Sequence, residues 1–382
     1  MKQKRETVRF TGFGKIGLAA FIVLLVSGAT PTLKDGPYVL YSDDTAVAQY
    51  INNNVVETKN TNDLSAATDL DNSRFKIVLK NKLRAEEAVY PKPEKLLALS
   101  DIEGNFEAFR KLLQSNKIID EKYNWTFGRG HLVFCGDMFD RGEQVTECLW
   151  LVYTLEAKAK SAGGYVHFIL GNHEIMTLNG DARYVREKYL TNAKLLNSTY
   201  QQLFDVNSEL GRWLRTKNII EEIGDIIFLH GGIGKEVNKL RMTIDQINQA
   251  ARPWYDNEDS AMNSPNKTLN VLFGNKSPFW NRGYYQTEEK KVYAGSEQDT
   301  VYKVTTQDVN TTLAMYHVNR IVTGHTIVSD TVSIHFDGKV INIDTHHAGG
   351  KSEALLVEAD KYYRVNANGG KALLIKGETI AN

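Results

Sequence analysis

The chain has 382 residues, of which 42% are hydrophobic, so it can bury a large core and does not have the composition of a disordered protein. Lys and Arg total 46, and Asp and Glu also total 46, which gives a formal net charge of zero at pH 7. This balance excludes a global field that would draw the chain to nucleic acid or acidic lipid. We therefore expect no nucleic-acid partner and a ligand that is recognised locally.

The first residues have the pattern of a secretory signal. Basic residues precede an apolar run at 16–26, and Ser27-Gly28-Ala29 offers the small side chains that a signal peptidase needs. The run is shorter than the roughly 20 apolar residues of a membrane span, although an uncleaved anchor is the alternative. Residues 1–30 are thus predicted to be a signal peptide or membrane anchor. The rest would be exported, either periplasmic or anchored to the membrane outside the cytoplasm.

Residues 31–93 are predicted to form a small β-rich extension. Strand patterns at 37–41 and 46–51 flank a polar turn, and a further strand pattern lies at 74–79. No residue set with visible chemistry occurs in this segment. Pro91 and Pro93 mark its end.

Residues 94–382 alternate apolar strand patterns with helical patterns. Strands are expected at 96–99, 132–135, 165–170, 226–229 and 320–323, and helices at 106–114, 145–159, after Gly180 and at 313–317. Three more strands with hairpin spacing are expected at 332–336, 340–343 and 354–358. This order predicts a layered α/β fold with mixed sheets. Residues from about 252 to 312 are polar and irregular in pattern, which is typical of an insertion.

Polar side chains follow five of these strands. In α/β folds the carboxyl ends of strands form the edge where ligands bind. Taken singly, a strand-end Asp is more often a turn former, and a lone His is more often a hydrogen-bonded structural residue. Five such junctions in one chain instead favour a metal or phosphate site. The residues in question are Asp101 and Glu103, Asp137 with Asp140 and Arg141, Asn172 with His173, His230, and His325.

These junctions carry a family resemblance. The ordered segments resemble the motif set of calcineurin-like metallophosphoesterases, and the Asp-Arg-Gly form of the second resembles the phosphoprotein phosphatase branch. Residues 178–185 and 278–283 are similar to the Shewanella-like bacterial phosphatases within that branch. The resemblance implies a layered α/β/β/α sandwich with mixed sheets. The motifs are Ser100-Asp101-Ile102-Glu103-Gly104-Asn105, residues 136–142, Gly171-Asn172-His173-Glu174, His230-Gly231-Gly232 and Gly324-His325-Thr326.

The resemblance also implies a role for each residue. Asp137 would bridge two divalent metal ions, with Asp101 and Glu103 completing the first site. Asn172, His230 and His325 would complete the second. Such a metal pair generates a bridging hydroxide and clamps the phosphoryl oxygens. His173 would protonate the leaving oxygen with Asp140 orienting its ring, and Arg141 would grip the phosphate, with Arg282 as a second clamp.

One departure from the family pattern concerns the first metal position. The family usually has His where this chain has Glu103. The first site would then have only oxygen donors, which favours manganese, magnesium or ferrous iron over zinc. The alternative is that Glu103 does not bind metal and that the first site is weak.

Other polar residues have open roles. His346 and His347 could contact substrate or supply a missing ligand, although a structural role is the simpler interpretation. Asp181, Arg183 and Tyr184 could form either a salt-bridge network beside the site or part of the substrate rim.

The sequence therefore predicts an exported dinuclear-metal phosphatase that acts on phosphomonoesters. The substrate would be a phosphorylated protein, or a nucleotide or other small molecule. The alternative from another class is a catalytically silent module that uses the metal cleft for recognition.

Overall fold

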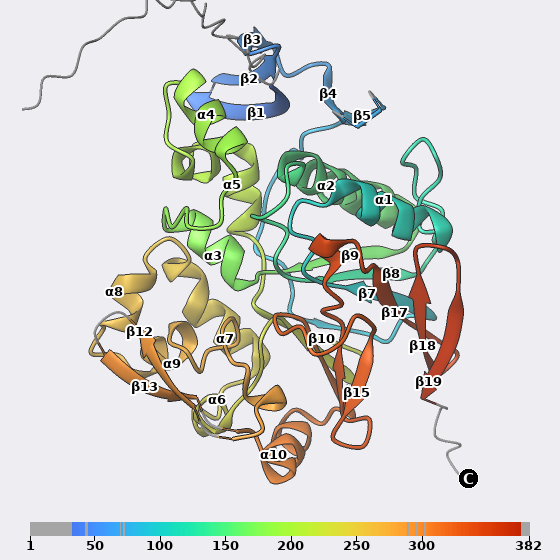
Figure 1. The fold of residues 1–382 in the computed structure, drawn as a ribbon, viewed down its shortest axis with the longest axis vertical. Coiled ribbons are helices and arrows are strands. Elements are labelled where there is room, and N and C mark those ends of the chain that lie inside the picture. The colour runs from blue at the N-terminus through green and yellow to red at the C-terminus, as the bar shows by residue number, and fades with distance from the viewer. Residues whose placement is uncertain are drawn as a thin grey trace, which may run out of the picture. The chain divides into compact units, whose positions relative to one another are not determined.

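The computed structural model describes residues 33–42, 45–68, 70–71, 73–288, 290–294, 297–301 and 303–375 (Figure 1). The predicted signal peptide or anchor at residues 1–30 lies outside these residues. No helix within the described ranges is both long enough and apolar enough to cross a bilayer.

The first large sheet is built on β7 (Lys95–Leu99), an apolar strand that is buried on both faces. It pairs in parallel with β8 (His131–Cys135), which in turn pairs in parallel with β9 (Tyr165–Ile169). The other edge of β7 pairs antiparallel with β17 (Glu353–Glu358), and β18 (Lys361–Asn366) and β19 (Lys371–Ile375) extend the sheet. In Figure 1 the C-terminal strands, in red, thus join strands from the first half of the chain.

The second large sheet has the strand order β15-β16-β14-β11-β10-β6. Its centre consists of β11, β14 and β16, which run parallel to one another. Both sheets therefore mix parallel and antiparallel pairs, as predicted. The strands are β6 (Val89–Tyr90), β10 (Ile220–Ile223), β11 (Ile226–Leu229), β14 (Arg320–Thr323), β15 (Ser333–His335) and β16 (Val340–Asn342).

The alternation of side chains along β7 explains the layers. Leu96 and Ala98 belong to a core that also contains residues of β11 and β14, so they face the second sheet. Leu97 and Leu99 belong to the core on the opposite face, together with Phe106 and other residues of the helices. Helices α1 (Phe106–Ser115) and α2 (Val145–Ser161) lie on that side, and α7 (Ile244–Ala251) packs on β10 of the second sheet. The predicted α/β/β/α sandwich is confirmed.

The N-terminal strands are tied to the helices of the first sheet. β1 (Lys34–Ser42), β2 (Thr45–Asn52) and β3 (Val55–Lys59) form an antiparallel sheet, and β4 (Leu64–Ala67) pairs with β5 (Arg74–Ile77). Trp150 Nε1 in α2 donates to the carbonyl of Pro37 at 2.8 Å. The hydroxyl of Tyr41 donates at 2.7 Å to Glu209 of α5 (Glu209–Leu214). These buried contacts explain why β1 lies against the helices.

The remaining regular elements include short helices in the region predicted to be an irregular insertion. The segment is more regular than predicted, because α8, α9 and the β12–β13 hairpin lie within residues 252–312. Asn266 caps α9 by accepting from the N–H of Thr268. The elements are α3 (Asn172–Leu178), α4 (Glu187–Leu195), η1 (Gln201–Phe204), α6 (Lys235–Lys239), η2 (Arg252–Trp254), α8 (Glu258–Met262), α9 (Lys267–Phe273), η3 (Gly283–Tyr285), β12 (Lys290–Ala294), β13 (Glu297–Val301), α10 (Thr306–Tyr316) and η4 (His347–Gly349).

The last three predicted strands do not form one continuous run of hairpins. β15 and β16 are an antiparallel hairpin, as expected. The next strand, β17, pairs with β7 in the other sheet instead. The connection from β16 to β17 contains η4 and crosses from the second sheet to the first. It therefore passes the edge at which the strand-end polar residues gather.

Candidate metal centre

The predicted site residues come together because backbone hydrogen bonds join the loops that carry them. The N–H of Asp101 donates to the carbonyl of Gly136 at 3.1 Å, and that of Glu103 donates to the carbonyl of Asp137 at 2.9 Å. The N–H of Gly324 likewise donates to the carbonyl of His230 at 2.9 Å. These bonds gather the loops within each sheet, and residues of both sets line one cleft.

The backbone at this cleft adopts conformations that non-glycine residues rarely populate. Left-handed φ angles concentrated in one place cost free energy and are typical of functional sites. The residues concerned are Asp101 (φ +55°), Glu103 (+46°), Asp137 (+58°), Asp140 (+71°), Arg141 (+52°) and His325 (+68°).

Gly171 permits a close approach of two loops at this cleft. A Cβ atom at this position would lie 2.3 Å from Asp137 Oδ1 and 2.7 Å from the Asp137 nitrogen. Only glycine lets the loop after β9 pass this close to the Asp137 carboxylate. The N–H of His173 then donates to Asp137 Oδ1 at 3.0 Å.

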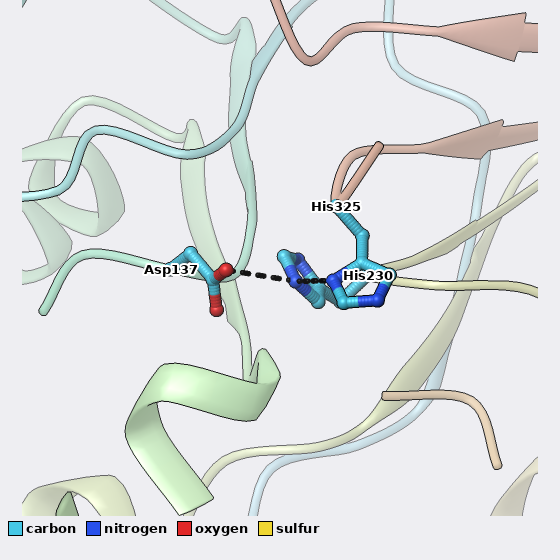
Figure 2. Close-up of side chains that lie close together, drawn as sticks. All are labelled: Asp137, His230 and His325. Atoms are coloured by element: carbon cyan, nitrogen blue, oxygen red, sulfur yellow. Dashed lines mark hydrogen bonds and ion pairs between the residues drawn. The ribbon is translucent and has the colours of Figure 1, made fainter. Parts of the chain in front are cut away.

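One group of candidate metal ligands consists of Asp137, His230 and His325. Each offers one donor atom, and the three atoms lie within 4.8 Å of one another. Figure 2 shows them arranged in a row: Asp137 Oδ2 lies 3.0 Å from His230 Nε2, which lies 3.1 Å from His325 Nδ1. Asn172 Oδ1 is 2.9 Å from the same His230 nitrogen. The four side chains predicted for the second metal site are thus gathered.

A second group shares Asp137. It consists of Glu103, Asp137 and His173, whose donor atoms also lie within 4.8 Å of one another. Asp101 is in neither group. Its Oδ2 accepts from Ser100 Oγ at 2.5 Å and from the N–H of His325 at 3.0 Å. Asp101 nevertheless lines the same cleft. Asp137 is therefore the residue common to both groups.

The charges of these side chains depend on one another. Burial alone would raise the pKa of Asp137, but the imidazoles of His230 and His173 outweigh it and hold the pKa below its usual range. Burial would lower the pKa of His230, but Asp137 dominates and raises it to about 9. Burial and the neighbouring His230 hold the pKa of His325 well below its usual value. Asp137 and His230 thus stabilise each other's charged forms.

His173 and Asp140 form a buried pair next to this centre. His173 Nδ1 lies 2.5 Å from Asp140 Oδ2, and His173 Nε2 lies 3.8 Å from Asp137 Oδ2. Burial alone would lower the pKa of His173, but Asp137 and then Asp140 outweigh it and raise the pKa. The geometry suits a proton donor whose ring is held by a carboxylate.

The two predicted phosphate-binding arginines both line the cleft. The guanidinium of Arg141 is half-exposed and pairs with Glu103, which is buried. Arg282 donates from Nη1 to the carbonyl of His325 at 2.5 Å and to Thr326 Oγ1 at 3.2 Å. Glu103 therefore faces Arg141 as well as the candidate metal position.

The sequence did not single out Glu174 as a site residue. It is completely buried, and its carboxylate accepts from the N–H groups of Asp137 at 2.9 Å, Met138 at 2.7 Å and Gly171 at 2.7 Å. It thus fixes the loop that carries Asp137 to the start of α3. An acidic residue directly after Asn172-His173 in the first turn of a helix was the available signal.

A second residue not predicted at the site is Asp344, which follows β16. It is 3% exposed and lines the cleft of about 400 Å³ together with Asp101, Asp137 and Arg282. Burial, followed by the charge of Asp101, raises its pKa to about 8. Its position just beyond a parallel strand is the same signal that identified the other residues.

The residues with open roles lie around the cleft. His346 and His347 both line it; His346 is exposed, whereas His347 is buried with its Nδ1 2.9 Å from Ser352 Oγ. Asp181 pairs with Arg183 at 2.7 Å. Tyr184 is 46% exposed, and its ring centroid lies 5.3 Å from that of His173. The guanidinium carbons of Arg141 and Arg183 lie 5.5 Å and 5.8 Å from the Tyr184 centroid.

The donor set fits divalent cations. Within the described part of the chain, His325 Nε2 is buried without a hydrogen-bond partner. Such a group is costly unless something binds it. Carboxylate, imidazole and amide oxygen donors around one shared carboxylate are also ligands that divalent metals accept.

Comparisons with known proteins agree with this geometry. The sequence model of the calcineurin-like phosphoesterase family matches residues 94–329. The chain is 24% identical over 308 residues to Shewanella-like protein phosphatase 2 of Arabidopsis thaliana, covering 70% of this chain and 74% of that protein. It is 29% identical over 191 residues to Shewanella-like protein phosphatase 1 of Plasmodium berghei (strain Anka), covering 48% of this chain and 52% of that protein.

A solved structure is similar over nearly its whole length. It is the crystal structure of a cold-active protein-tyrosine phosphatase of a psychrophilic Shewanella species. The TM-score is 0.79 and the sequence identity 35%, and the match covers 90% of this chain and 99% of that one.

The pair of His173 and Asp140 gives a testable electrostatic prediction. In chelator-treated protein, Asp140→Asn should lower the pKa of His173 by about 1 pH unit or more, because it removes a carboxylate that favours the imidazolium form. The pKa can be followed by NMR titration of the ring nitrogens. Asp330→Asn, which changes a half-exposed carboxylate, is the control and should leave the pKa unchanged. An unaltered His173 pKa in Asp140→Asn would contradict the pairing.

Proposed function

The chain belongs to the calcineurin-like phosphoesterase family and is a metal-dependent phosphatase, and from this premise we propose that it is an exported phosphomonoesterase with two divalent metal ions around Asp137. The observation that carries the proposal is the sharing of Asp137 by two ligand groups beside the pair of His173 and Asp140. A single metal site would not need a carboxylate common to both.

Each side chain then has a place in the reaction. Asp137, Asn172, His230 and His325 would hold one cation, and Asp137 with Asp101 and Glu103 would hold the other. When bound, such a pair of cations supplies the hydroxide nucleophile at neutral pH and offsets the charge of the phosphoryl oxygens.

The protein's own side chains donate the proton and bind the phosphate. His173, whose pKa is raised by Asp137 and Asp140, gives its proton to the leaving oxygen. Arg141 and Arg282 line the cleft and bind the remaining phosphoryl oxygens. To do so, the guanidinium of Arg141 exchanges part of its contact with Glu103 for the phosphate.

Manganese is the cation that we propose for this centre. Asp101, Glu103 and Asp137 provide only oxygen donors at one position, and hard oxygen donors suit manganese, magnesium or ferrous iron better than zinc. The imidazoles of His230 and His325 at the other position accept a wider range of metals.

For the substrate, we propose a phosphorylated protein, and phosphotyrosine in particular. The similar Shewanella structure is that of a protein-tyrosine phosphatase. In this chain the exposed ring of Tyr184 stands beside His173, and Ile327, 54% exposed, lines the cleft. An exposed aromatic ring beside the proposed proton donor suits an aryl phosphate. Nucleotides and other small phosphoesters are the alternative substrates.

A silent recognition module is disfavoured by one observation. The buried pair of His173 and Asp140 places a potential proton donor within 3.8 Å of Asp137. A module that only binds has no use for such a donor.

The proposal of export is supported by the signal pattern of residues 1–30. Cell fractionation of the producing organism with an antibody to this chain should find the protein outside the cytoplasm. Recovery of the protein from the cytoplasmic fraction alone would contradict export.

Hydrolysis of a chromogenic phosphomonoester by chelator-treated protein tests the metal-dependent reaction. Activity should be absent without metal and should return most strongly with manganese. Asp137→Asn should lower kcat by at least about 1,000-fold, because one substitution disturbs both ligand groups. Asp330→Asn is the matched control and should retain wild-type activity. Activity that survives Asp137→Asn, or that returns only with zinc, would contradict the proposal.

A substrate panel tests the preference for phosphotyrosine. Phosphotyrosine peptides should be hydrolysed with a higher kcat/KM than phosphoserine peptides, nucleotides or sugar phosphates. Tyr184→Ala should lower kcat/KM for the phosphotyrosine peptide by about 5-fold, as expected for the loss of an aromatic contact of about 1 kcal/mol, and change it little for phosphoserine. Equal kcat/KM for all substrates would contradict the proposed preference for phosphotyrosine.

A further inference from the structure

The topology provides one more strand-end side chain than the proposed metal site uses. Each large sheet contains three mutually parallel strands: β7, β8 and β9 in the first, and β11, β14 and β16 in the second. A polar side chain that lines the cleft or contacts the candidate ligands follows every one of them. The six are Asp101, Asp137, Asn172, His230, His325 and Asp344. Only Asp344 has no role so far.

The register of the second sheet places Asp344 next to the loop that carries His325. Thr323 at the end of β14 pairs with Asn342 at the end of β16, and the strands run parallel. His325 and Asp344 therefore stand at equivalent distances beyond their strands, on the same edge of the sheet. Both line the cleft that contains Asp101 and Asp137.

The carboxylate of Asp344 is held in place by its own loop. Its Oδ1 accepts from the N–H of His346 at 3.2 Å, and the N–H of Asp344 donates to Asn342 Oδ1 at 2.9 Å. His346 continues the turn with a left-handed φ of +61°. The carboxylate is thus pre-positioned in the cleft while remaining 3% exposed.

Asp344 differs from Glu103, Asp140 and Asp137 in its lack of a charged partner, which it shares with Asp101 among the described residues. Glu103 pairs with Arg141, Asp140 with His173, and Asp137 with His230. Asp344 makes no ion pair with Lys, Arg or His among the side chains that the structure describes. In its charged form, a buried carboxylate without such a partner is unfavourable unless a cation binds it.

One feature at each proposed metal position bears on this cation. His325 Nε2 is buried without a hydrogen-bond partner among the described residues, although His325 lines the cleft. Glu103, the only candidate at the position where the family usually has His, shares its carboxylate with the guanidinium of Arg141. The first metal position therefore needs another donor.

We propose that Asp344 is a further metal ligand, which supplies a carboxylate oxygen to the cation on the Asp101 side of the cleft. This inference rests on the proposed two-metal function and completes the oxygen-rich first site. A competing role for Asp344 is to position Arg282, whose Nη1 donates to the carbonyl of His325 in the same cleft. In that role Asp344 would influence phosphate binding and leave metal binding unchanged.

Metal titration of the chelator-treated full chain tests this assignment. Manganese binding by isothermal titration calorimetry should show two ions for the wild type. In Asp344→Asn, one of the two affinities should fall by about 10- to 100-fold while the other stays within about 3-fold. Asp344→Glu, which keeps a carboxylate, should recover part of the loss. Asp330→Asn is the control and should bind like the wild type.

Folding is followed separately by thermal unfolding in the presence of chelator. If Asp344→Asn does not fold, Asp344→Ser is measured in its place, with the same expected loss at one site. Two wild-type affinities in the folded variant would overturn the assignment, and so would an equal weakening of both sites. An unchanged metal affinity with a raised KM would assign Asp344 to Arg282 instead.

The same data separate this inference from the proposed function. If the wild type binds only one manganese ion, the two-metal proposal fails. The role of Asp344 is then decided by that single ion: a weaker affinity in Asp344→Asn supports the role, and an equal affinity overturns it.

Discussion

The buried carboxylate of Asp137 is the constraint on which the site depends. A carboxylate between two packed sheets is disfavoured by its loss of water unless positive charge and hydrogen-bond donors surround it. His230 at 3.0 Å, His173 at 3.8 Å and the N–H of His173 at 3.0 Å meet that need. Because these groups follow β11 and β9, which belong to different sheets, the sandwich has to close for the carboxylate to be satisfied. The candidate metal centre therefore depends on the packing of the two sheets.

The backbone around Asp137 shows how the sequence meets this constraint. Left-handed φ angles at Asp101, Asp137 and His325 turn their side chains inward, and residues in such conformations each cost on the order of 1–3 kcal/mol. Gly171 lets a loop pass beside the Asp137 carboxylate, and Glu174 binds three N–H groups of the two loops. These contacts explain how a strained arrangement can persist without bound substrate.

Much of this arrangement could be predicted from the sequence, and the exceptions have physical reasons. The strands at 226–229 and 320–323 were located correctly because short apolar runs bounded by polar residues are typical of buried strands. The pairing of β17 with β7 was not predicted, because spacing along the chain does not reveal that the connection after β16 changes sheets.

The roles of individual side chains were harder to predict than the place where they gather. The convergence of Asp137, His230 and His325 follows from their positions at strand ends. The contact between Glu103 and Arg141 depends on side-chain geometry that no spacing encodes. Glu174 and Asp344 were not singled out, because their importance comes from burial and from backbone groups brought close only in the folded chain.

The central claim is that two cations share the carboxylate of Asp137. Anomalous diffraction from crystals of the manganese-loaded protein tests it most directly. Two manganese peaks are expected, one on each side of the Asp137 carboxylate, with His230 and His325 beside one of them. A single peak, or peaks that do not contact Asp137, would contradict it.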